Sequence, residues 1–113
     1  MLETPSTSAS SRSELNAALK AMVLQECNVR GVRGEDIGDE DLVIGGKGSL
    51  QLDSLDAVEI VSALERQFGI RLESAGDARQ VFRSFQAMSD YVVANASAEK
   101  TAAFVATHSA SRV

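Results

Sequence analysis

Apolar residues between Ser54 and Phe68 recur at steps of three and four, a spacing that predicts an amphipathic helix. At about 100° per residue, one face of this helix collects its core-type side chains. These are Ala57, Ile60, Leu64 and Phe68, with Val61 at the edge. Gly69 follows where a left-handed residue often ends a helix. A narrow apolar stripe must be covered by other helices, so the pattern favours a helical bundle.

A second helix is expected from Ser11 to about Cys27. Ser11 and Glu14 have the spacing of a capping box, which marks a helix start. The apolar stripe of this helix consists of Leu15, Leu19, Met22, Val23 and Cys27. Residues 1–10 are rich in serine and threonine and show no periodicity, so we expect a disordered leader there.

Two further helices are expected after Gly69. Asp77 is placed to cap a short third helix over residues 78–82, and Ser84 to cap a fourth. The fourth helix has an apolar side formed by Phe85, Met88, Tyr91, Val92 and Ala96. Residues 96–113 are expected to form a helical extension or a flexible tail.

Composition supports an all-α domain. Apolar residues make up 44% of the 113, and aromatic residues only 4%, which suits a small aliphatic helical core. We expect one four-helix domain over residues 11–95 with a long first loop and a short third helix. No apolar stretch is long enough to span a membrane, and the N-terminal residues lack the features of a secretory signal. Cys27 is alone, which fits a reducing, cytoplasmic setting.

Residues 28–53 form a long connection broken by six glycines, and long connections in compact domains are usually functional. We expect Ile37, Leu42 and Ile44 to anchor it to the bundle. Eleven of the sixteen acidic residues lie between Glu35 and Asp77. This surface is either simply solvated or steers basic partners, and nucleic-acid binding is not expected because phosphates repel it. The acidic residues lack the alternating spacing of an EF-hand, so no metal site is expected.

Leu55 and Val58 lie on or beside the face of the Ser54–Phe68 helix that is opposite the core stripe. Three interpretations stay open. The two residues are ordinary exposed apolar residues, or the long loop covers Leu55, or they form a small docking patch beside Ser54 that Asp56 and Glu59 surround. Ser54 at a helix start has the positive end of the helix dipole beside it, which tolerates an attached anion. A hydrolase would need a histidine at Ser54, and His108 is expected to be a surface residue of the tail.

The string Leu52-Asp53-Ser54-Leu55-Asp56-Ala57-Val58-Glu59-Ile60-Val61 resembles the acyl carrier protein family. Leu64-Glu65, Phe68-Gly69-Ile70 and the segment Ser84 to Val92 extend the resemblance, which covers about residues 11–95. It implies a stand-alone carrier that is not an enzyme. Ser54 would bear covalent 4′-phosphopantetheine, whose thiol holds acyl groups as thioesters for lipid or secondary-metabolite synthesis.

The resemblance also implies roles for other residues. Asp53 would assist the magnesium-dependent transfer of phosphopantetheine to Ser54. Partner enzymes would dock on residues Leu55, Asp56, Val58 and Glu59. Acyl chains would enter a pocket lined by Ile60, Leu64, Phe68 and Tyr91. The implied partners of a monomeric carrier are a phosphopantetheinyl transferase and acyl-transfer or ketosynthase-type enzymes with basic docking surfaces, without membrane insertion.

Four positions depart from the family pattern. Gln51 replaces a usual glycine, Ser62 replaces a docking methionine, and Arg66 and Gln67 stand where acidic residues are common. These departures suggest a specialised carrier dedicated to one pathway. Two alternatives stay open: an aminoacyl carrier protein, and an unmodified helical interaction module in which Ser54 only caps the helix.

Overall fold

The computed structural model describes residues 4–44 and 52–110, and within them the only regular elements are helices. The α-helices are α1 (Thr4–Glu26), α2 (Ser54–Phe68), α3 (Ala75–Phe82), α4 (Phe85–Asn95) and α5 (Ala98–Ala110). A 3₁₀ turn, η1, lies at Gly34–Asp36. The expected all-α fold class is therefore confirmed. Residues 1–3, 45–51 and 111–113, on which parts of the sequence expectations fall (Gln51 among them), lie outside the described residues. None of the described helices is both long and apolar enough to cross a membrane.

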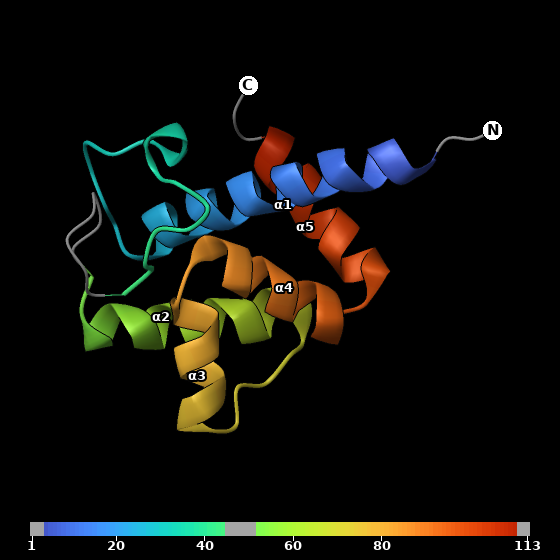
Figure 1. Cartoon of the computed structure of the whole chain (residues 1–113). Helices are drawn as coiled ribbons and strands as arrows, with labels where there is room; N and C mark the ends of the chain where they lie inside the picture. Colours follow the sequence, from blue (N-terminus) through green and yellow to red (C-terminus); the bar gives the residue numbers. More distant parts are fainter. Residues whose placement is uncertain (1–3, 45–51, 111–113) are drawn as a thin grey trace.

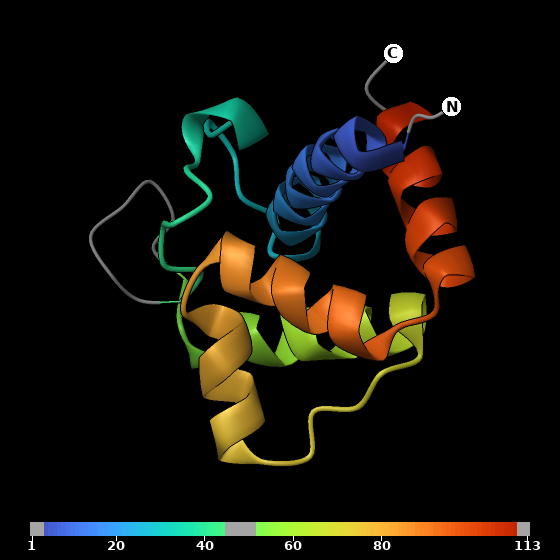
Figure 2. The same cartoon turned by 45° about the vertical axis from the view of Figure 1, so that its right-hand side comes forward.

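The helices pack around one aliphatic core. In Figures 1 and 2, α4 runs between α1 and α2, α3 lies across the lower side of the molecule, and α5 packs at the end against α1. The core side chains with essentially no exposure come from α1, α2, α3 and α4, together with the first loop. They include Leu15, Leu19, Met22, Val43, Ile60, Leu64, Val81, Phe85, Met88 and Val92.

The N-terminal helix begins earlier than the sequence indicates. α1 starts at Thr4, so Ser11 lies inside the helix, the capping-box start is wrong, and residues 4–10 are helical where a disordered leader is expected. Pro5 falls in the first turn, where its missing N–H has no intrahelical partner to lose, so nothing in this stretch stops the helix. The division of the chain into leader, carrier domain and extension stays a prediction.

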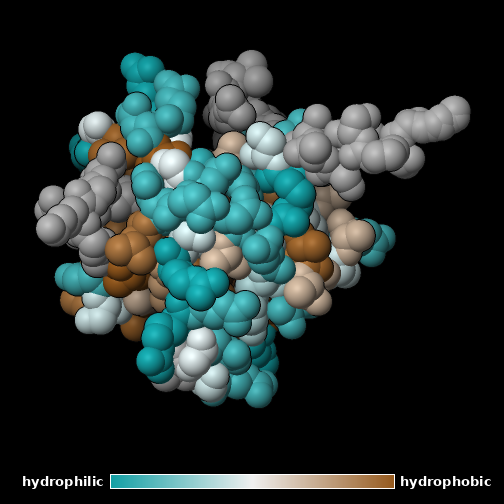
Figure 3. Space-filling view, in the orientation of Figure 1, coloured by the Kyte–Doolittle hydropathy of each residue, from teal (hydrophilic) through white to brown (hydrophobic). Residues whose placement is uncertain are grey.

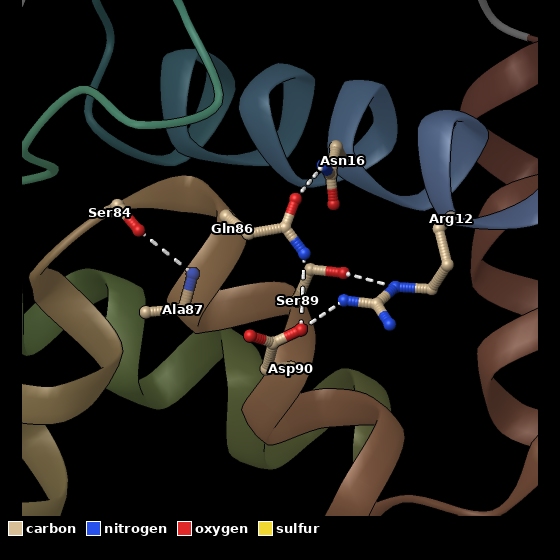
Figure 4. Close-up of polar contacts among 7 residues, drawn as sticks. All are labelled: Arg12, Asn16, Ser84, Gln86, Ala87, Ser89 and Asp90. Carbon is tan, nitrogen blue, oxygen red and sulfur yellow. Dashed lines mark hydrogen bonds and ion pairs between the residues drawn. The ribbon is translucent and has the colours of Figure 1, made fainter. Parts of the chain in front are cut away.

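A polar seam fixes α1 against α4 (Figure 4). Arg12 pairs with Asp90, and its Nε donates a hydrogen bond to Ser89 Oγ at 3.1 Å. Asn16 Nδ2 donates to Gln86 Oε1 at 3.0 Å, and Gln86 Nε2 donates in turn to Asp90 Oδ1 at 3.1 Å. Because Asn16 and Ser89 are buried, these directional bonds specify how the two helices face each other.

The C-terminal segment forms a separate fifth helix that closes one end of the core. Phe104 of α5 is buried, with its ring 4.6 Å from that of Phe68 on α2. His108 is also buried, stacked 4.1 Å from Phe104, and its Nδ1 lies 3.0 Å from the Phe104 carbonyl oxygen. The expectation of a surface His108 is wrong, because one turn of helix places its ring over Phe104.

The first loop is anchored partly as expected. Ile37 is buried and Ile44 packs against the core, but Leu42 is 49% exposed and its neighbour Val43 is fully buried. The backbone N–H of Val43 donates to the carbonyl oxygen of Phe82 at 3.1 Å. This bond sets which of the two adjacent side chains faces inward, and the expected anchor at Leu42 is wrong.

The ends of the two short helices follow from their caps. Ser74, rather than the expected Asp77, caps α3, because its Oγ accepts the N–H of Asp77 at 3.1 Å. Ser84 caps α4 as expected, with the N–H of Ala87 donating to its Oγ at 2.9 Å. Ser74 thus fixes where α3 begins, and Ser84 fixes where α4 begins after the short turn at Arg83.

Candidate functional site

The start of α2 is held by Asp53. Its Oδ1 accepts the backbone N–H groups of Leu55 at 3.1 Å and Asp56 at 3.2 Å. The Asp56 carboxylate in turn accepts the N–H of Asp53 at 3.0 Å, which completes a reciprocal capping box. Sequence analysis missed this cap, although an aspartate three residues before a second acidic residue is a recognisable signal.

Ser54 is the first residue of α2 and lies exposed on the surface. No hydrogen bond of its side chain is present within residues 4–44 and 52–110. Because Asp53 caps the helix, the hydroxyl of Ser54 is not needed to accept a backbone N–H at the helix start. The reading of Ser54 as the helix cap is therefore wrong, and its oxygen is accessible to a modifying enzyme.

The electrostatics of this helix start are set by the Asp53 carboxylate. The backbone N–H of Asp56 is the main cause that lowers the pKa of Asp53 below its ordinary value, so Asp53 is ionised at neutral pH. Asp53 Oδ1 also accepts the two backbone N–H groups, of Leu55 and Asp56, that could otherwise donate hydrogen bonds to an anion on Ser54. An attached phosphodiester is thus expected to extend away from the helix end rather than fold back onto it.

Two exposed apolar side chains and two acidic ones surround Ser54. Leu55 is 76% exposed and Val58 is 61% exposed, next to the partly exposed Asp56 and the exposed Glu59. In Figure 3, hydrophobic surface appears on the side of the molecule where α2 begins. The described part of the first loop, residues 28–44 with 52 and 53, leaves Leu55 exposed.

α2 is tied to the end of α1 through contacts that the sequence pattern did not reveal. The thiol of Cys27 donates to the Asp56 carbonyl oxygen at 3.8 Å, and Arg66 pairs with Glu26 at 3.1 Å. Burial, followed by the nearby charges of Asp56 and Glu59, raises the pKa of Cys27 to about 11. Cys27 is therefore a protonated, half-buried thiol that helps to position α2.

The four residues expected to line an acyl pocket lie in or beside the core. Ile60, Leu64 and Phe68 are buried, and Tyr91 is half-buried with its hydroxyl donating to the Arg71 carbonyl oxygen at 3.4 Å. A groove of about 690 Å³ is bordered by α1, α4 and α5, and none of the four residues lines it. The predicted pocket is thus occupied by packed side chains, and its opening to a cargo stays a prediction.

Neither a metal centre nor a catalytic group accompanies the serine. Among the described residues, no group of three or more histidine, cysteine, aspartate and glutamate side chains is arranged to hold a metal ion. The only histidine of the chain, His108, is packed on α5 against Phe104. The Ser54 hydroxyl itself is exposed at the start of α2.

Comparison with known proteins agrees with this geometry. Residues 48–92 match the family model described as the phosphopantetheine attachment site, a segment that contains Ser54 and the helices α2 and α3. The match confirms the resemblance to the acyl carrier protein family. Carrier domains of this kind are non-catalytic and are modified on a serine by a phosphopantetheinyl transferase. No curated protein and no solved structure matches the chain significantly.

Proposed function

We propose that Ser54 bears the 4′-phosphopantetheine group and that the cargo is an acyl chain. The match of residues 48–92 to the family model for the phosphopantetheine attachment site supports this proposal. One observation carries this proposal: Ser54 is exposed at the first position of α2 while Asp53 performs the capping. The side-chain oxygen of a serine that only capped the helix would accept a hydrogen bond from a backbone N–H of the first turn.

The residues around Ser54 have separate tasks in this proposal. The Ser54 hydroxyl oxygen attacks the phosphorus of coenzyme A that bears the pantetheine arm, and a phosphodiester bond forms. The pyrophosphate P–O bond breaks, adenosine 3′,5′-bisphosphate leaves, and the hydroxyl proton passes to a base of the transferase. The ionised Asp53 lies next to this oxygen in the chain and supplies a carboxylate toward the transferase's magnesium. When attached, phosphopantetheine supplies the thiol that holds the acyl group as a thioester.

Partner enzymes are proposed to dock on Leu55, Asp56, Val58 and Glu59. Leu55 and Val58 project apolar surface from α2, and Glu59 adds an exposed negative charge. An apolar centre with a charged rim is the usual anatomy of a specific interface. Acyl-transfer or ketosynthase-type enzymes with basic docking surfaces match this face. Ser62, Arg66 and Gln67 depart from the family pattern, and this favours a carrier dedicated to one pathway. That pathway would be lipid or secondary-metabolite synthesis in the cytoplasm.

The test is the intact mass of the protein before and after incubation with coenzyme A, Mg²⁺ and a broad-specificity phosphopantetheinyl transferase. The parent is expected to gain one phosphopantetheine, and Ser54→Ala none. Ser62→Ala is the matched control, because Ser62 is also exposed on α2, and it should be modified like the parent. Modification of Ser54→Ala would refute the assignment of the attachment residue.

The nature of the cargo is tested on protein recovered from its source cells. Hydroxylamine cleaves a thioester, so the group released from the holo-protein can be identified by mass spectrometry. An acyl hydroxamate is the expected product. An aminoacyl hydroxamate would refute the acyl cargo and favour the aminoacyl carrier alternative, while the attachment at Ser54 would still stand.

A further inference from the structure

The outer face of α3 carries two arginines one helical turn apart. At about 100° per residue, Gly76, Arg79, Gln80 and Arg83 fall on one side of the helix, and Val81 lies on the other. Val81 is fully buried, whereas Arg79 and Arg83 are exposed. The same four outward residues line a hollow of about 460 Å³.

These two arginines differ from most of the other basic side chains described. Arg12, Lys20, Arg33 and Arg66 each pair with an acidic side chain of the same chain. Within the described residues, no ion pair or side-chain hydrogen bond involves Arg79 or Arg83.

The acidic residue of α3 does not neutralise the outer face. Asp77 lies in the first turn of α3, and within the described residues it forms no ion pair with either arginine. Burial, followed by the charge of Asp77, raises the pKa of Tyr91 on α4. The two guanidinium groups at the end of α3 therefore keep their hydrogen-bonding capacity for another molecule.

The charge of this face is opposite to that of the neighbouring α2. Figures 1 and 2 both draw the C-terminal end of α3 close to α2, and in Figure 3 the surface over α3 is mostly hydrophilic. The exposed face of α2 carries Asp53 and Glu59, and the whole chain has a net charge of −5. A long polyanion such as a nucleic acid or an anionic membrane would be repelled by this setting. A protein surface with a local acidic patch beside a basic one would match both helices.

We propose that the Arg79–Arg83 face of α3 binds carboxylate side chains of a partner protein, so that the docking surface of this carrier is acidic on α2 and basic on α3. The planar guanidinium group forms paired hydrogen bonds with carboxylates, and two such groups one turn apart match acidic residues one turn apart on a partner helix. A surface with both signs fixes the orientation of the partner and disfavours a partner whose docking face is uniformly basic. The proposal adds a second contact to the proposed carrier function, but its chemistry does not depend on phosphopantetheine.

The experiment uses the full-length chain and a defined probe. The probe is a fluorescein-labelled helical peptide with two glutamates four residues apart, and a peptide with lysines at those positions is its control. Amide shifts of Gly76, Gln80 and Arg83 in ¹H–¹⁵N spectra locate the binding, and fluorescence anisotropy gives the dissociation constant. Measurements at low salt, about 20 mM, keep exposed charges from being screened.

The glutamate peptide is expected to shift the α3 amides. The dissociation constant should rise about tenfold in Arg79→Gln/Arg83→Gln, because two charge-assisted contacts are lost. Arg30→Gln is the matched control, since Arg30 is exposed outside α3, and it should bind like the parent. The lysine peptide should leave the α3 amides in place.

Three results would overturn the proposal: absent α3 shifts, equal affinity of the double variant and the parent, or shifts of the same size with inorganic phosphate at equal concentration. The last result would identify a general anion site instead of a protein-binding face. Repeating the titration with Ser54→Ala separates the two proposals. That variant should bind the glutamate peptide normally even if the parent accepts no phosphopantetheine.

Discussion

Replacing Phe104 with alanine tests whether α5 belongs to the folded core. Phe104 is 2% exposed, and its ring lies 4.6 Å from Phe68 and 4.1 Å from His108. Truncating a buried phenylalanine removes its transfer free energy and leaves a cavity, at a typical cost of about 3–5 kcal/mol. Small domains have a total unfolding free energy of about 5–15 kcal/mol, so this one change is expected to remove a large part of it.

The assay is urea unfolding of the full chain followed by far-ultraviolet circular dichroism. Val93→Ala is the control, because Val93 is 47% exposed on α4 and should change the unfolding free energy by less than about 0.5 kcal/mol. Phe68→Ala and the double variant complete a mutant cycle, in which the Phe68–Phe104 ring pair should show a coupling of about 0.5–1.5 kcal/mol.

A loss below about 1 kcal/mol in Phe104→Ala would refute the reasoning, because a buried ring cannot be removed so cheaply from a packed site. Zero coupling with Phe68 would show that α5 does not pack on α2 as described. Either result would turn the fifth helix into a surface appendage and leave the carrier site on α2 untouched.

Four further predictions concern Val43, Cys27 and Ser54. Val43→Ala should lower the unfolding free energy by about 1–3 kcal/mol because Val43 is fully buried, while Leu42→Ala should change it by less than about 0.5 kcal/mol, as measured by urea unfolding. Cys27, whose pKa is raised to about 11, should be alkylated by iodoacetamide at pH 8 far more slowly than in urea-unfolded chain, and equal rates would contradict its burial. The raised thiol pKa also favours the folded state below the unfolded value near 9, and this contribution should be lost as pH rises through about 11, seen as a falling urea midpoint that Cys27→Ala lacks. Ser54→Ala should leave the urea midpoint within error of the parent because Asp53 supplies the cap, and a marked loss would show that the Ser54 hydroxyl has a structural role.

Much of the fold was predictable because its signals are local. The three- and four-residue spacing in α2 predicted burial of Ile60, Leu64 and Phe68, and Gly69 ends that helix with a φ of 70° in the left-handed region. The Ser84 cap was equally predictable, because a serine directly before a helix with an apolar side is a typical N-cap signal. These features depend on residues within one or two turns of each other.

The errors occurred where a distant contact decided the outcome. Leu42 and Val43 are adjacent apolar residues, and the bond from Val43 to the Phe82 carbonyl oxygen selects which one is buried. His108 looks like a tail residue until α5 packs on α2 through Phe104. At the site, the sequence indicated Ser54, but the structure gave the capping role to Asp53.

The sequence by itself determined the helical class, the face that α2 buries, and the serine that heads this helix, because hydrophobic spacing and helix-end chemistry act over a few residues. Only the tertiary structure decided that the Ser54 hydroxyl is accessible, that Arg79 and Arg83 pair with none of the described acidic residues, and that α5 closes one end of the core. Accessibility and pairing depend on which segments meet in space, and burial of apolar surface between segments far apart in the chain sets those meetings.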